Sequence, residues 1–411
     1  MESMTPLSRP ESLGMSSSRL ARIDRFLNER YVASGKLPFA HLQIAREGRL
    51  VHQSILGKAS LESGALAAED TIVRIYSMTK PVTSVAFMML VEEGRVALDD
   101  PVHRFIPAWR DLGVYRSGRP GRFETVPPSA PMRMIDLLRH TSGLTYGMQM
   151  RTTVDAAYRA GAIEPFDQQG GLQGFIDALA GLPLEFTPGS AWNYSVSTDV
   201  LGYLVGQISG VPFERFLQER VFGPLGMVDT AFHVDPAQAE RFASCYYRKP
   251  SGELALLPGR SFLEPATAPS GGGGLVSTGA DYMRFCEMLR RGGALGETRL
   301  LGPKTLALMR SNHLPGGRDI ADLSVSLFSE AAYQGVGFGL GFSVTTDVTR
   351  TGIAGSIGEY GWGGLASTVF WIDPVEDLCV IFLTQLVPSS TYPVRRELRT
   401  LINAAIVESK A

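Results

Sequence analysis

The sequence predicts an α+β fold with one antiparallel sheet built from both ends of the chain. Extended runs occur before residue 57 and again after residue 335, and each group is flanked by one amphipathic helical pattern. The intervening residues show helical patterns separated by glycine and proline turns. We therefore expect a sheet domain of residues 1–76 and 280–411, a mainly helical domain of residues 77–279, and a ligand site in the cleft between them.

The N-terminal part of the sheet domain predicts one helix and one hairpin. Ser18 is a candidate N-cap, and apolar residues follow it at helical spacing: Leu20, Ile23, Leu27 and Tyr31. Residues 40–46 and 50–56 are extended runs around Glu47-Gly48-Arg49, which indicates a β-hairpin. In its first arm, Ala40, Leu42 and Ile44 share one face.

The C-terminal part predicts further strands and a last helix. Residues 336–345, 365–372 and 378–383 read as strands, and Asp373-Pro374 begins the turn between the last two. Residues 393–407 read as a helix with Val394, Leu398, Leu401 and Ala405 on one side. Both terminal helices should cover the same face of the sheet.

The middle of the chain predicts helices joined by turns. The helical patterns span residues 134–139, 172–182, 198–208 and 213–221. The run Ser270-Gly271-Gly272-Gly273-Gly274 should mark the return of the chain to the sheet domain.

Composition excludes several classes of protein. The chain has 411 residues, of which 44% are apolar and 19% are charged, which is typical of an ordinary globular protein. Its net charge is −2, so it offers no basic surface for nucleic acid or an anionic membrane. The apolar run 82–91 is too short to span a bilayer. The N-terminus lacks a basic start followed by an apolar run, which favours the cytoplasm.

The cysteines and histidines do not suggest a metal site. Cys245, Cys286 and Cys379 are far apart and lack ligand spacing, so we expect free thiols packed as small apolar groups. The histidines are isolated, and we expect no metal and no cofactor. His140 reads as a structural histidine.

The strongest chemical signal is Ser77-Met78-Thr79-Lys80, which precedes an almost wholly apolar helix. Residues at i and i+3 of a helix share a face, so the Lys80 amine can reach the Ser77 hydroxyl. A lysine in apolar surroundings loses proton affinity and can act as a base for a serine nucleophile. The alternative is a capping serine with a solvated lysine, but the chain contains no second S-x-x-K and the following helix is too apolar for a surface.

Two further segments carry candidate site residues. Tyr194 follows a Pro-Gly turn in Asn193-Tyr194-Ser195-Val196, and a phenol beside a lysine can shuttle protons. The alternative is a tyrosine packed on Trp192. In Trp362-Gly363-Gly364-Leu365 the glycines allow close approach of backbone to ligand, and the N–H groups of Leu365 and Ser77 can form an oxyanion hole. The alternative is a glycine-rich hairpin.

Taken in order, these motifs resemble the serine β-lactamase and penicillin-binding-protein superfamily, and within it the family VIII carboxylesterases. The likeness extends over most of the chain through four connecting segments: Leu98-Asp-Asp-Pro-Val102, His140-Thr-Ser-Gly-Leu144, Pro188-Gly-Ser190 and Pro224-Leu-Gly-Met227. It implies Ser77 as nucleophile, Lys80 and Tyr194 as the proton-transfer pair, and the Ser77 and Leu365 amides as oxyanion hole.

The chain departs from the lactamase pattern at two places. Val196 stands where lactamases and peptidases of the superfamily carry the Asn of Tyr-x-Asn, and Trp362-Gly363-Gly364 replaces Lys-Thr-Gly. Both changes remove polar partners of penicillins and peptides and favour neutral acyl groups in a pocket formed by these four residues. We therefore expect a carboxylesterase acting on small esters. A β-lactamase or D-amino-acid peptidase, an acyltransferase and a non-catalytic binding protein remain as alternatives.

Overall fold

The computed structural model describes residues 7–325 and 333–411. A seven-stranded antiparallel sheet has the order β11-β12-β13-β14-β15-β1-β2, so strands from both ends of the chain meet where β15 pairs with β1. The strands are β1 Phe39–Arg46, β2 Arg49–Gly57, β11 Val336–Phe338, β12 Ser343–Thr345, β13 Tyr360–Gly363, β14 Val369–Asp373 and β15 Leu378–Leu383. The predicted α+β class and the sheet built from both termini are confirmed.

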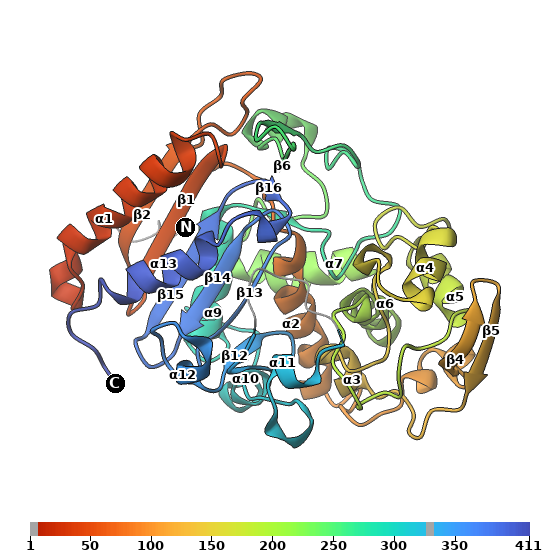
Figure 1. Cartoon of the computed structure of the whole chain (residues 1–411). Coiled ribbons are helices and arrows are strands. Elements are labelled where there is room, and N and C mark those ends of the chain that lie inside the picture. The colour runs from red at the N-terminus through yellow and green to blue at the C-terminus, as the bar shows by residue number, and fades with distance from the viewer. Residues whose placement is uncertain (1–6, 326–332) are drawn as a thin grey trace.

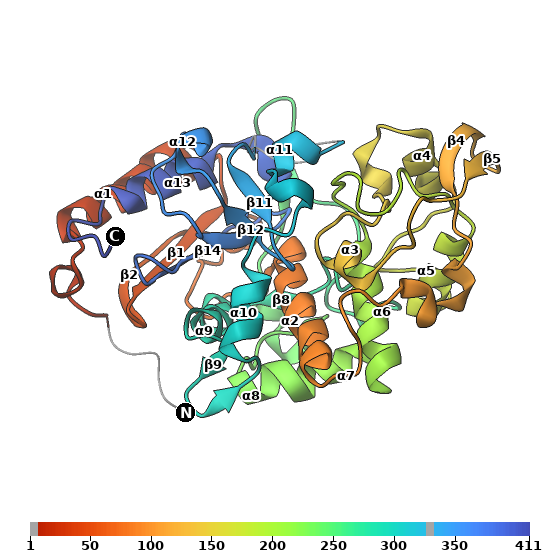
Figure 2. The same cartoon turned by 90° about the horizontal axis from the view of Figure 1, so that it is seen from below.

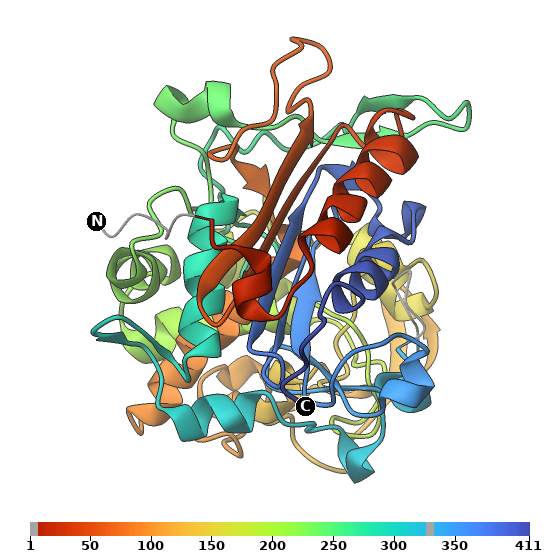
Figure 3. The ribbon, with the colours of Figure 1, turned by 90° about the vertical axis from the view of Figure 1, so that its left-hand side faces the viewer.

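The two faces of the sheet pack against different helices. In β15, Leu378, Val380 and Phe382 pack with the helices α1 (Ser17–Leu27) and α13 (Val394–Asn403), which lie side by side over that face (Figures 1 and 3). The alternate residues Cys379, Ile381 and Leu383 belong to the main core, together with α9 (Gly279–Arg290). The prediction that both terminal helices share one face is correct, because side chains alternate along a strand.

The helix α2 (Thr79–Glu92) runs through the middle of the molecule, between the sheet and the helices around α6 (Figures 1 and 2). It is buried from Thr79 to Leu90 and packs on α6 (Ser197–Ser209). α6 also contacts α3 Met134–Leu138, α5 Gly171–Ala180 and α7 Phe213–Leu217, α4 Thr153–Ala160 lies in the same part of the molecule (Figure 1), and α8 Gly223–Leu225 contacts α9. The boundaries set at residues 77 and 279 stay a prediction.

Short elements complete the described chain. Small sheets are formed by β3 Val73–Arg74 with β8 Val276–Ser277, by β4 Val114–Arg119 with β5 Arg122–Val126, by β9 Ala294–Leu295 with β10 Thr298–Arg299, and by β16 Leu386–Val387 with β6 Tyr246–Arg248 and β7 Leu254–Leu256. Short helices are α10 Pro303–Met309, α11 Ile320–Leu323 and α12 Val348–Thr351.

Several predicted boundaries are wrong where a turn interrupts an extended run. Residues 336–345 form two strands rather than one, because Gly341 turns the chain with φ +98°. The strand expected at 365–372 begins only at Val369, since Ser367 takes a left-handed φ of 67° in the turn before it. Residues 360–363, which were expected only to bring glycine backbone close to a ligand, form strand β13.

The helix ends also differ slightly from the predictions. Ser16, not Ser18, caps α1 by accepting from the Arg19 N–H. The helix expected at 213–221 leaves the α conformation after Leu217 and continues as a π-turn over 218–222. In α13 the buried stripe contains Ile402, while Leu401 is only half-buried.

Candidate active site

Ser77 lies in the short turn Tyr76–Met78 between β3 and α2. This turn is anchored from two sides: the Tyr282 hydroxyl of α9 donates to the Met78 carbonyl at 2.8 Å, and the Leu275 N–H donates to the Thr79 Oγ1 at 3.2 Å. Tyr76 has a left-handed φ of 42°, which is strained for a residue with a Cβ. The fold therefore holds the Ser77 hydroxyl at the start of a buried helix.

The Lys80 side chain lies one helical turn further on and is 2% exposed. Its Nζ contacts three oxygens: Ser77 Oγ at 3.3 Å, Tyr146 Oη at 3.0 Å and the Gly272 carbonyl at 2.6 Å. The structure thus brings Ser77 and Lys80 together, and Lys80 does not reach bulk solvent. A lysine amine so placed can exchange a proton with the serine hydroxyl.

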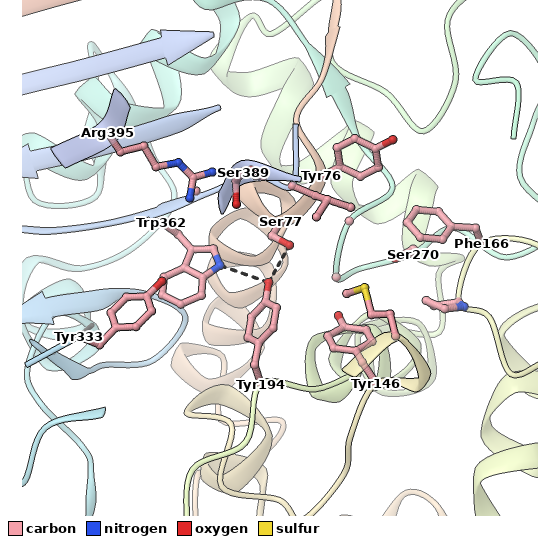
Figure 4. A pocket seen from close by; sticks show the side chains of 17 residues that line it. Tyr76, Ser77, Tyr146, Phe166, Tyr194, Ser270, Tyr333, Trp362, Ser389 and Arg395 are labelled. Carbon is pink, nitrogen blue, oxygen red and sulfur yellow. Dashed lines mark hydrogen bonds between the residues drawn. The ribbon is translucent and has the colours of Figure 1, made fainter. Parts of the chain in front are cut away.

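Tyr194 approaches Ser77 from the loop that precedes α6. Its hydroxyl donates to Ser77 Oγ at 2.6 Å and accepts from Trp362 Nε1 at 3.4 Å (Figure 4). The Lys80 Nζ lies 4.6 Å from the centre of the Tyr194 ring, and His140 packs on the same ring at 5.1 Å between centroids. The phenol is therefore fixed within proton-transfer distance of Ser77, beside a lysine.

The segment Trp362-Gly363-Gly364-Leu365 closes the other side of the site. The Trp362 indole is stacked on Tyr333 at 5.9 Å and meets Phe338 edge-on at 5.3 Å. A Cβ on Gly364 would lie 2.3 Å from the Ile75 carbonyl oxygen, so only glycine lets this segment sit against the Ser77 turn. Leu365 lines the same cavity as Ser77, and within the described residues its N–H has no hydrogen-bond acceptor.

These residues surround a cavity of about 120 Å³ (Figure 4). Its further walls are mostly aromatic or apolar: Tyr76, Tyr146, Met148, Pro165, Phe166 and Tyr333. Among the described residues that line it, Arg395 carries a formal charge, and its guanidinium donates to the Gly364 and Thr368 carbonyls. Most of the surface next to the Ser77 hydroxyl is therefore apolar.

Residues 27–404 match the sequence profile of the family described as Beta-lactamase. The chain belongs to the beta-lactamase family. It is 35% identical over 360 residues to Protein Rv1367c of Mycobacterium tuberculosis (strain ATCC 25618 / H37Rv), covering 86% of this chain and 87% of that protein. It is 31% identical over 389 residues to Esterase EstB of Burkholderia gladioli, covering 90% and 91%.

Solved structures of the family share the whole architecture. EstCE1, described as a hydrolase with promiscuous acyltransferase activity, superimposes with a TM-score of 0.78 and 26% identity over 97% of this chain and 99% of its own. The resemblance inferred from the motifs is therefore correct, and the chain is a serine hydrolase of the beta-lactamase family.

One residue assigned to the pocket lies elsewhere in this beta-lactamase-family fold. Val196 is 1% exposed, stands at the N-cap of α6, and donates its N–H to the Thr145 carbonyl at 3.3 Å. It is not among the residues that line the cavity, and its expected contact with substrate stays a prediction. Its side chain packs in the main hydrophobic core.

Sequence reasoning missed a buried group behind Lys80. The Asp199 carboxylate, in the first turn of α6, accepts from Ser270 Oγ at 2.5 Å, the Gly272 N–H at 2.9 Å and the Tyr146 hydroxyl at 3.4 Å. Burial raises the pKa of Asp199, and the Lys80 ammonium opposes that shift in pKa. A charged residue inside the otherwise apolar pattern of 197–208 was the signal that could have identified it.

His140 and the three cysteines are buried. His140 is buried, and burial, with the nearby Lys80, holds its pKa well below the ordinary value, so it stays neutral. Its Nδ1 is 3.3 Å from Ser195 Oγ. Cys245, Cys286 and Cys379 are buried free thiols, as expected.

Within residues 7–325 and 333–411, no group of three or more His, Cys, Asp or Glu side chains is placed to bind a metal ion. Over the same ranges, no helix combines the length and the apolar character needed to cross a bilayer.

Proposed function

We propose that this chain is a carboxylesterase that hydrolyses small neutral esters through an acyl-enzyme on Ser77. The observation that carries the proposal is the convergence of the Ser77, Lys80 and Tyr194 polar atoms beside a small aromatic cavity. Esterase EstB, similar over nine-tenths of both chains, supports the same activity class.

In the proposed reaction the Ser77 oxygen attacks the ester carbonyl while its proton passes to the Lys80 and Tyr194 pair. The N–H groups of Ser77 and Leu365 stabilise the oxyanion that forms. Collapse of the tetrahedral intermediate breaks the C–O bond to the alcohol, which leaves with the proton delivered by the Tyr194 hydroxyl. A water molecule then attacks the acyl-enzyme by the reverse proton path and releases the acid.

The preference for neutral acyl groups rests on the cavity walls. Trp362 occupies the place that a lysine would need to hold a substrate carboxylate, and it packs between Tyr333 and Phe338. The cavity volume of about 120 Å³ favours short or medium acyl chains.

A second candidate activity is transfer of the acyl group to an alcohol or amine in place of water. The named activity of EstCE1 supports it, because the same acyl-enzyme serves both reactions. Product analysis with and without a competing alcohol separates the two: an ester product in excess of the acid would assign the acyltransferase.

The test is a panel of p-nitrophenyl esters of increasing acyl length run beside nitrocefin. We expect butyrate turnover to exceed nitrocefin turnover, and Ser77→Ala to abolish both. Ser356→Ala is the matched control, because Ser356 lies outside the cavity, in the loop between α12 and β13. A Ser77→Ala protein with wild-type ester turnover, or a preference for nitrocefin, would contradict the proposal.

A further inference from the structure

The contacts of Lys80 leave one direction for its lone pair. A neutral lysine amine has two N–H donors and one lone pair, and here its nitrogen contacts three oxygens. The Gly272 carbonyl at 2.6 Å can only accept, so it takes one N–H. To act as a base, Lys80 must point its lone pair at the Ser77 hydroxyl. Its second N–H must then donate to the Tyr146 hydroxyl oxygen.

The hydroxyl of Tyr146 accepts from Lys80 only if its own proton is directed elsewhere. Asp199 Oδ2 lies 3.4 Å from Tyr146 Oη and is the acceptor for that proton. The other oxygen, Asp199 Oδ1, already accepts from Ser270 Oγ and from the Gly272 N–H. Burial and the neighbouring Asp199 hold the pKa of Tyr146 well above its ordinary value, so the phenol keeps its proton.

We propose that Asp199 is a positioning residue: it binds the Tyr146 proton and thereby turns the lone pair of Lys80 toward Ser77 Oγ. It also accepts from the Gly272 N–H, and so helps to hold in place the residue whose carbonyl accepts from Lys80. Asp199 acts without touching substrate, through Tyr146 and Gly272. The inference deepens the proposed function, because it rests on Lys80 as the base for Ser77.

The titratable groups that surround Asp199 come from three parts of the chain. Lys80 faces it from α2, Tyr146 from the loop before α4, and the partly buried Glu164 from the loop between α4 and α5. A purely structural role is the alternative, since an acidic residue in the first turn of a helix is stabilising in itself. The experiment must therefore separate orientation of Lys80 from stability of α6.

Asp199→Asn makes this separation because it conserves shape. The Gly272 N–H cannot rotate, so the asparagine oxygen must stay at the Oδ1 position and its NH₂ group must face Tyr146. Tyr146 then accepts from asparagine and turns its proton to the lone pair of Lys80, which ties up the base. We expect kcat to fall by about 10²-fold or more, with KM within about threefold of wild type.

The decisive variant is Asp199→Asn combined with Tyr146→Phe. Removing the phenol proton frees the lone pair, so the double variant should be at least about tenfold faster than Asp199→Asn and close to Tyr146→Phe alone. A structural role predicts the opposite, with the double variant as slow as or slower than either single one. An Asp199→Asn protein with wild-type kcat, or one not rescued by Tyr146→Phe, would overturn the inference.

The rate at which an active-site phosphonate labels Ser77 is the second measurement for all four proteins, because it needs no assumption about the natural substrate. The same order of rates is expected. Wild-type protein that is not labelled at Ser77 overturns the proposed function together with this inference, whereas equal labelling of wild type and Asp199→Asn overturns the inference alone.

Discussion

Gly364 offers a direct test of how closely the segment 362–365, which carries the Leu365 amide, must pack against the turn that carries Ser77. Its N–H donates to the Thr368 carbonyl at 2.8 Å, and its carbonyl accepts from Arg395. A Cβ added at this position would meet the Ile75 carbonyl oxygen and the Thr368 Oγ1, both at 2.3 Å. Gly364→Ala therefore forces the two segments that carry Leu365 and Ser77 apart.

The size of the effect follows from these distances. An ordinary contact for a Cβ begins at 3.4 Å, so the backbone must shift by 3.4 − 2.3, or about 1.1 Å. A shift of this size takes the Leu365 N–H out of hydrogen-bond range of an oxyanion also held by the Ser77 N–H. Loss of one oxyanion donor costs about 10²–10³-fold in kcat, which corresponds to roughly 3–4 kcal/mol.

The assay is steady-state hydrolysis of p-nitrophenyl butyrate, with the thermal midpoint of unfolding recorded for each protein. Gly181→Ala is the matched control, because its nearest neighbour to a new Cβ is 3.7 Å away. We expect Gly181→Ala to keep the wild-type kcat. Gly364→Ala should lose kcat although its thermal midpoint of unfolding stays near that of wild type. Wild-type kcat in a folded Gly364→Ala protein would refute the role given to the Leu365 amide.

Three further predictions follow from other parts of the molecule. Lys80→Ala and Tyr194→Phe should each lower kcat for p-nitrophenyl butyrate by about 10²–10⁴-fold with little change in KM; a loss confined to KM would argue against proton transfer. Burial lowers the pKa of His41 from 6.5 to about 4 in the folded state, so the folded protein binds fewer protons than the unfolded chain and loses stability as pH falls from about 7 to 5. In urea unfolding, the wild type should lose about 2 kcal/mol of stability over this range, and His41→Gln should not. Equal losses in both proteins would exclude His41 as the cause. Burial raises the pKa of the Cys245 thiol to about 11 and shields all three cysteines. A disulfide reagent should therefore label no cysteine in the native protein and three cysteines after unfolding. Rapid labelling of the native protein would contradict the packing described.

Much of the fold could be predicted because its elements have strong local periodicity. The β1–β2 hairpin, strand β15 and the buried stripes of α1 and α13 follow from alternation or helical spacing over adjacent residues. The breaks inside 336–345 and 365–372 could not be predicted in this way. They depend on single left-handed residues, Gly341 and Ser367, within otherwise apolar runs.

The sequence by itself determined that the proposed nucleophile and its proposed base meet, since Ser77 and Lys80 are joined by one helical turn and their distance is set by helix geometry. The tertiary structure alone decided which groups surround them. Tyr146 reaches Lys80, and Asp199 reaches Tyr146, from segments distant in the chain, and the outcome depends on how α2 and α6 pack together. For the same reason Val196 turned into the core while Tyr194, two residues earlier, reached Ser77: local spacing fixes neighbours along the chain, but packing chooses the direction of each side chain.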